Sequence, residues 1–170
     1  MSITESIFGS SAASAVQRHL SRLVVSPGQI LVTVDSGAAA SVCPSGVFDH
    51  WPPEDGEDGL SFQAADGSIV PELYKVRPLV VTDEGQYRQT QFSVANVNKV
   101  LMSAAQVANR GHRIVLQPYY MESYIEDIAT GDRMALHQQD GVYVQRLTHV
   151  QADPDGSFQG QAPDYIPNVL

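Results

Sequence analysis

The chain has 170 residues, the size of one ordinary domain with at most a short extension, and 43% of them are hydrophobic, which is enough to build a buried core. Ten lysines and arginines against nineteen aspartates and glutamates give a formal net charge of −9, the wrong sign for a protein that grips nucleic-acid phosphates. We therefore expect no direct binding of nucleic acid.

The chain contains a single cysteine, Cys43, which cannot form a disulfide within the chain. This favours a reducing, intracellular compartment, most simply the cytoplasm. The sequence has no cluster of cysteines and histidines at zinc-ligand spacing, so neither a metal nor another cofactor is expected. No stretch approaches the roughly 18 apolar residues of a membrane span, and residues 1–9 lack the basic start and apolar run of a signal peptide. We expect no membrane association.

Residues 1–28 are expected to form a lead segment with one short helix. One face of this helix carries apolar residues at positions i, i+4 and i+7, and other faces carry two arginines. These residues are Val16, Leu20, Leu23, Arg18 and Arg22. The turn-forming sequence Ser26-Pro27-Gly28 follows.

A mostly buried strand is predicted from Gln29 to Asp35, because apolar and β-branched residues dominate it. The strand leads into Asp35-Ser36-Gly37. A carboxylate at the end of a buried strand, followed by a hydroxyl and a glycine, can be held by backbone N–H groups in a tight turn while its oxygens face a cleft. Such a carboxylate suits a catalytic acid or base. The triplet alone also suits an ordinary turn that ends a strand, so its context has to decide.

Beyond Leu60, turn residues such as Asp66-Gly67 separate short apolar runs, which predicts a series of antiparallel strands. The expected strands are 62–64, 76–81, 92–97, 114–116, 124–128, 134–136 and 142–144. One helix interrupts them from Met102 to Arg110 and is closed by Gly111. Residues 148–170 are rich in Asp, Pro, Gly and Gln and are expected to form a flexible tail or linker.

In this order the pieces resemble the retropepsin family of aspartic proteases. The strand followed by Asp35-Ser36-Gly37-Ala38 is similar to the family's catalytic turn. The apolar pair Val100-Leu101, followed by the short helix and a strand, is similar to the block that passes behind that turn. Between them, residues 62–70 resemble the flap hairpin, with Asp66-Gly67 near its tip.

The closest variant is the protease of copia-type retrotransposon polyproteins. Similar phrases recur there: a flap of the form Phe-x-Ala-x-Asp/Asn-Gly-Ser, an entry to the helix of the form Val-x-Asn-Val-x-x-x-Leu-(Leu/Met)-Ser, and a later Gly-Val-Tyr. In this chain they are Phe62 to Ser68, Val94 to Ser103, and Gly141-Val142-Tyr143. The resemblance covers roughly Gln29 to Leu147. It implies a mainly β fold: a closed, retropepsin-like β-barrel with one short helix at 29–117, and a β-hairpin extension at 118–147.

The resemblance also implies an aspartic endopeptidase that processes a retrotransposon-type polyprotein. In such an enzyme two nearby carboxylates share one proton. The chain has a single Asp-Ser/Thr-Gly, so Asp35 would meet its counterpart across the two-fold axis of a homodimer, and activity would peak on the acid side of neutrality. The resemblance assigns the catalytic turn to Asp35, Ser36 and Gly37. It assigns the peptide-binding positions to Ala38, Ala65, Asp66, Gly67 and Ser68.

Departures from the family pattern keep a second hypothesis open. Ser103 stands where the family usually has Gly, and Ala104-Ala105 replace an Arg-Asn that many viral relatives carry. The chain would then be a catalytically inactive, retropepsin-like module for dimerisation or peptide binding. A third hypothesis is an unrelated β-rich binding domain. A nucleophilic role for Cys43 is disfavoured, because nothing in the sequence ties any histidine to it.

Overall fold

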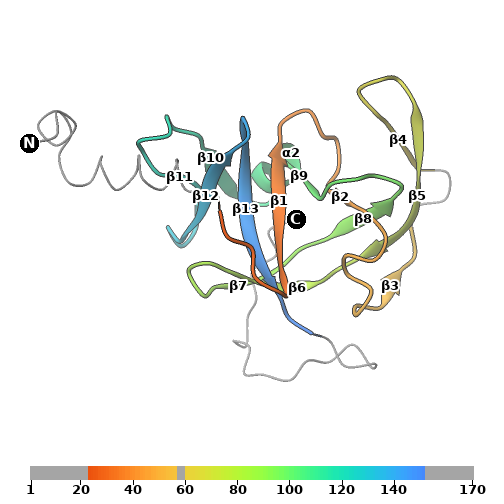
Figure 1. The fold of residues 1–170 in the computed structure, drawn as a ribbon, viewed down its shortest axis with the longest axis horizontal. Helices are drawn as coiled ribbons and strands as arrows, with labels where there is room; N and C mark the ends of the chain where they lie inside the picture. Colours follow the sequence, from red (N-terminus) through yellow and green to blue (C-terminus); the bar gives the residue numbers. More distant parts are fainter. Residues whose placement is uncertain (1–22, 57–59, 152–170) are drawn as a thin grey trace, which may run out of the picture.

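The structure is a computed structural model that describes residues 23–56 and 60–151. Within them the chain is mainly β, with one short helix (Figure 1). The helix predicted within residues 1–28 falls outside the described residues, apart from Leu23, which is not helical. Of the predicted tail, Thr148 and His149 belong to the last strand, and residues 152–170 are not described.

The elements follow one another in short succession along the chain. They are β1 (Gln29–Asp35), β2 (Val42–Cys43), β3 (Pro53–Glu54), β4 (Ser61–Gln63), β5 (Ile69–Val76), β6 (Leu79–Thr82), β7 (Tyr87–Gln89), β8 (Phe92–Ala95), β9 (Leu101–Ser103), α2 (Ala104–Asn109), β10 (His112–Val115), β11 (Ser123–Asp127), β12 (Arg133–Gln139) and β13 (Val142–His149).

Most predicted strands are present, with two instructive differences. The expected strand 76–81 is divided, because β5 ends at Val76 and β6 begins at Leu79. Pro78 lies at the break and has no N–H to donate to a sheet; its carbonyl instead accepts a hydrogen bond from the Thr90 N–H (3.1 Å). Strands β2, β3, β7 and β9 were not predicted; they are two or three residues long, and the sequence of β7, Tyr-Arg-Gln, lacks an apolar alternation.

The strands form one extended sheet in the order β10-β11-β12-β13-β1-β9-β2-β8-β5-β3. Strand β4 adds to β5, and β6 pairs with both β13 and β7. The predicted closed barrel is wrong: within residues 23–56 and 60–151, β10 and β3 end the order and do not pair with each other. Strand β3 has only two residues and begins with Pro53, which cannot donate to a neighbouring strand and is typical of a sheet edge.

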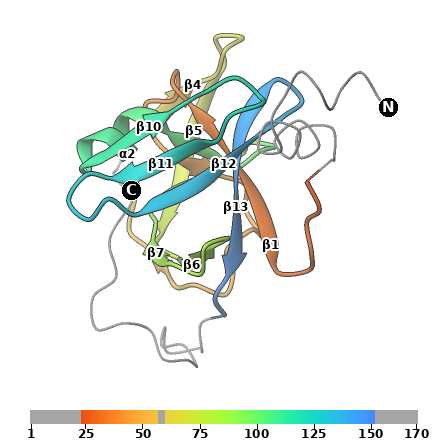
Figure 2. The ribbon, with the colours of Figure 1, turned by 90° about the vertical axis from the view of Figure 1, so that its left-hand side faces the viewer.

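Strand β1 lies in the middle of this sheet. It runs antiparallel to β13, with Thr33 opposite Val144, and parallel to β9, with Asp35 opposite Ser103. Figure 2 shows β13 crossing alongside β1. The segment predicted as a hairpin extension therefore contributes β11, β12 and β13 to the same sheet that carries Asp35.

The hydrophobic core gathers around the sheet and the helix. Val32, Phe92, Met102 and Val107 are each fully buried, and Phe48 stacks on Phe92 with ring centroids 5.3 Å apart. Burying each such side chain stabilises the fold by about 1.5–3 kcal/mol. In the described part of the chain, no helix is long and apolar enough to cross a membrane.

Candidate active site

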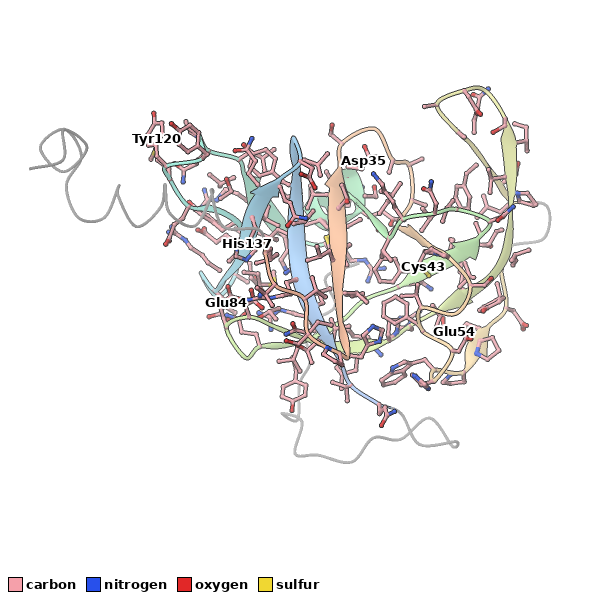
Figure 3. All side chains as sticks on the ribbon, viewed as in Figure 1. Asp35, Cys43, Glu54, Glu84, Tyr120 and His137 are labelled. Carbon is pink, nitrogen blue, oxygen red and sulfur yellow. The ribbon has the colours of Figure 1, made fainter. Side chains whose placement is uncertain are left out.

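The predicted catalytic turn follows directly after β1. The Gly37 N–H donates to Oδ1 of Asp35 (2.7 Å), which fixes the carboxylate relative to the backbone. A Cβ atom at position 37 would lie 3.3 Å from the same oxygen, closer than ordinary van der Waals contact, so glycine gives the carboxylate room. Asp35 is partly buried, whereas Ser36 and Gly37 are exposed. Figure 3 shows Asp35 at the upper end of β1, beside the loop that follows it.

A buried serine on the neighbouring strand β9 forms a hydrogen bond with this turn. Ser103 is fully buried and lies opposite Asp35 in the parallel pairing of β1 with β9. Its Oγ donates to the backbone carbonyl of Ala38 (2.7 Å) and also accepts the N–H of Gln106 (3.3 Å), which caps the N-terminus of α2. One hydroxyl therefore connects the predicted catalytic turn to the start of the helix.

Ser41 and Gln106 also hold Ser103 and the start of α2 in place, and neither residue was predicted to belong to a site. Ser41 is buried; its Oγ accepts the N–H of Ser103 (2.9 Å), and its own N–H donates to Oε1 of Gln106 (2.9 Å). In an ordinary capping box the glutamine would reach back to the N–H of the capping serine. Here Ser41 is inserted between those two partners. The spacing Ser103-x-x-Gln106 is a capping-box signature. It is the sequence signal from which a role for Gln106 beside Ser103 could have been predicted.

The predicted flap is a β-hairpin made by β4 and β5, with Phe62 opposite Val70. Gly67 has a φ of 86° at its turn, a conformation that side-chain-bearing residues rarely adopt. Oδ1 of Asp66 accepts hydrogen bonds from the N–H of Ser68 (2.9 Å) and from its hydroxyl (2.7 Å). These bonds lower the pKa of the exposed Asp66 carboxyl, so Asp66 stays ionised in mildly acid solution.

The predicted site residues form two groups. Asp35, Ser36, Gly37 and Ala38 lie in one turn, and Ala65, Asp66, Gly67 and Ser68 are all exposed at the hairpin turn. In Figures 1 and 2 the hairpin tip projects from the same end of the molecule at which β1 ends. Among the described residues, no hydrogen bond joins the two groups directly. The sheet connects them instead, through the neighbouring strands β5, β8, β2, β9 and β1.

The other reactive side chains lie apart from Asp35. Cys43 is fully buried, and burial together with Asp49 raises the pKa of its thiol to about 12. A thiol with this pKa is a poor nucleophile, because only the thiolate reacts. Within residues 23–56 and 60–151, no three His, Cys, Asp or Glu side chains gather in an arrangement that could hold a metal ion.

Comparisons with known proteins add no relative to this description. A scan against protein-family models and searches of curated proteins and of solved structures found no match to this chain. Function is therefore inferred from the ordered motifs and from the geometry around Asp35 and the hairpin.

Proposed function

We propose that this protein is an aspartic endopeptidase of the retropepsin type, which acts as a homodimer on a polyprotein of the copia-retrotransposon kind. The observation that carries the proposal is the turn at the end of β1: the Asp35 carboxylate is fixed by the Gly37 N–H and backed by the buried Ser103. The enzyme would work in the cytoplasm, where its lone cysteine stays reduced.

The reaction needs two carboxyl groups that share one proton, because two like charges in close contact cannot both ionise. The ionised carboxylate takes a proton from a water molecule as the water oxygen attacks the scissile carbonyl carbon. The protonated carboxyl donates its proton to the carbonyl oxygen, which gives a neutral tetrahedral intermediate. Collapse of this intermediate breaks the C–N bond, and the leaving amine takes up a proton. Activity is then greatest on the acid side of neutrality.

The second carboxyl comes from another copy of the chain, because the sequence has a single Asp-Ser-Gly. Strand β10 supports dimerisation, because it ends the sheet and pairs on one side only, with β11, among the described residues. An edge of this kind can accept a strand from a second molecule. Two Asp35 turns would then face each other across the two-fold axis.

The remaining site residues bind the substrate in this proposal. Ser36 bonds across the two-fold axis, and Gly37 and Ala38 let the peptide backbone approach the carboxyls. The exposed hairpin turn, Ala65 to Ser68, lies over the bound peptide and contributes backbone hydrogen bonds. The extended peptide thus binds mainly through its main chain, as in strand addition to a sheet.

The deciding experiment measures hydrolysis of a pool of hydrophobic peptides at mildly acid pH by the full chain. Asp35→Asn abolishes cleavage, because an amide cannot share the proton. Asp140→Asn is the matched control: Asp140 is exposed, far along the chain at a turn with a φ of 52°, and asparagine tolerates that conformation well. Cleavage by Asp35→Asn at the wild-type rate refutes the proposal. A dimer that binds peptides and cleaves none of them supports the inactive peptide-binding module instead.

A further inference from the structure

The loop that follows the Asp35 turn has no side chain of its own that could fix it. Residues 38–40 are three consecutive alanines, whose side chains carry no hydrogen-bonding group. Gly37, directly before them, is the residue type with the greatest backbone freedom. The position of the Asp35 carboxylate therefore depends on the points at which neighbouring elements hold this loop.

Ser41 is the anchor at the far end of the loop. It is buried and directly precedes β2, which lies between β9 and β8 in the sheet. Its Oγ accepts the N–H of Ser103 on β9 (2.9 Å), its carbonyl accepts the N–H of Ser93 on β8 (2.9 Å), and its N–H donates to Oε1 of Gln106 on α2 (2.9 Å). Three different elements therefore determine where Ser41 lies.

Gln106 makes the contact with Ser41 that depends on a partner's side chain. The bonds from Ser93 and Ser103 both use the backbone N–H of the partner, so a change of either side chain leaves the donor in place. The bond to Gln106 instead needs the oxygen of its side-chain amide. A backbone N–H can only donate, so the amide oxygen and not the amide nitrogen has to face Ser41.

The loop is thus tied to the start of α2 at two points. The Ala38 carbonyl accepts a bond from Oγ of Ser103, which caps the helix, and the Ser41 N–H donates to Gln106 in the first turn. Without the Gln106 oxygen, the N–H of the buried Ser41 would lose its acceptor, and a buried donor without a partner is costly. The loop would then move until this N–H reached water or another acceptor, and the turn at Asp35 would move with it.

We propose that Gln106 is a positioning residue of the active site, which acts through Ser41 to fix the Asp35 turn. In this role Gln106 contacts neither the peptide nor the attacking water. A small displacement of the carboxylate lowers kcat, because the reacting groups must be closely aligned. This kinetic consequence rests on the proposed peptidase function, whereas the dependence of the turn on Gln106 is measurable without any activity.

The test compares Gln106→Met with Gln106→Glu in the full chain. Methionine favours a helix and matches glutamine in length, but its thioether is only a weak acceptor. Glutamate keeps an oxygen for the Ser41 N–H and suits the first turn of a helix. We expect Gln106→Met to lower kcat about tenfold with KM within about twofold of the wild type, and Gln106→Glu to keep kcat within about twofold. Asn109→Met, at an exposed position of the same helix, is the matched control and changes neither constant.

A second readout needs no peptidase activity. The Gly37 N–H donates to the Asp35 carboxylate, so the NMR resonance of its amide proton reports the geometry of the turn. This resonance should shift in Gln106→Met. Exchange of the Ser93 amide with solvent should also accelerate by about tenfold, because the Ser41 carbonyl that it binds is then less firmly held. In Gln106→Glu and Asn109→Met both observations should match the wild type closely.

A Gly37 resonance that is the same in Gln106→Met and the wild type overturns the proposal. An equal fall of kcat in Gln106→Met and Gln106→Glu also overturns it, because the acceptor would then be irrelevant. Loss of protection throughout the chain in Gln106→Met does so as well, since the residue would then serve the whole fold. If the wild type cleaves no peptide, the proposed function fails, while the NMR comparison still decides whether Gln106 positions the turn.

Discussion

Asp35 and Ser103 lie directly opposite each other where the parallel strands β1 and β9 end. The proposed catalytic turn and the first turn of α2 therefore begin at the same level of the sheet. The hydroxyl of Ser103 bonds to the loop after Asp35, and its N–H bonds to Ser41. The position of the carboxylate thus depends on a buried network that contains no charged group.

Replacing Ser103 by alanine tests this network. The change removes the helix cap and leaves the Ala38 carbonyl without its donor, so we expect the free energy of unfolding to fall by about 1–3 kcal/mol. Peptide cleavage also falls, mainly in kcat, because the turn is less well fixed. Chemical denaturation and steady-state kinetics measure the two effects. Ser45→Ala, at an exposed serine, is the control and changes neither.

Gly67→Ala tests the hairpin turn. An alanine at a φ of 86° costs about 1–2 kcal/mol, because its Cβ is strained in this left-handed region. Amide hydrogen exchange in β4 and β5 should accelerate, and KM for peptides should rise. Ser61→Ala, at an exposed position of β4, should have neither effect. Unchanged exchange and KM would show that the turn conformation is unimportant for binding.

The unfolding free energy should fall as the solution becomes acid, and His112 is one cause. The ring of His112 is buried, and this burial lowers its pKa below 6.5; Asp127, with a carboxylate oxygen 3.9 Å from Nε2, opposes the shift only in part. The folded state thus favours the neutral ring. The contribution of His112 to the free energy of unfolding is fully present above the unfolded pKa of about 6.5. It is lost as the pH falls from there through the lower pKa of the folded state. Chemical denaturation at a series of pH values between about 7 and 5 measures how steeply the free energy of unfolding depends on pH.

Variants separate the contributions of the buried His112 and the half-buried His149 to this slope. His112→Gln should flatten the dependence of stability on pH between about pH 7 and 5. Part of the slope that remains belongs to His149, whose pKa is also lowered, first by burial and then by His50. The double variant should be flatter still. An identical slope in the wild type and His112→Gln would contradict the assignment.

Cys43 should resist thiol reagents in the folded protein. Its pKa of about 12, against a reference value of 9.0, lowers the thiolate fraction at pH 8 by about three orders of magnitude. Labelling by iodoacetamide should therefore be slow in buffer and fast in denaturant, and complete labelling should require unfolding. A Ser45→Cys variant supplies an exposed thiol as an internal standard. Rapid labelling of Cys43 in the native state would contradict the buried position.

The local elements were predictable where one residue dictates a conformation. Gly67 and Gly111 have the positive φ that their turns require, and the predicted helix is present, although it begins at Ala104 and not at Met102, because Met102 and Ser103 belong to strand β9. The break between β5 and β6 at Pro78 could not be predicted from the sequence, because a proline is compatible with either an edge strand or a break between strands. The prediction of a closed barrel was wrong because pairing between the two end strands of a sheet is a long-range property that no local sequence pattern encodes.

The residues of the candidate site also fall into those that the local sequence predicts and those that depend on long-range contacts. Asp35, Ser36 and Gly37 were identified from three consecutive residues, whereas Ser41 and Gln106 act through contacts with Ser103 that arise only when β2, β9 and α2 come together. The parallel pairing of β1 with β9 joins segments more than sixty residues apart. Sequence periodicity gives the strands but not their neighbours, so the support beneath the turn could not be predicted.

The central claim, that two copies of Asp35 form one active site, is tested most directly by mixing subunits. Wild-type chain is exchanged with an excess of Asp35→Asn chain at fixed total concentration, and peptide cleavage is measured at mildly acid pH. If each site needs both carboxyls, the rate falls as the square of the wild-type fraction, because mixed dimers are inactive. A rate that falls in direct proportion to the wild-type fraction, or cleavage by Asp35→Asn alone, would contradict the account.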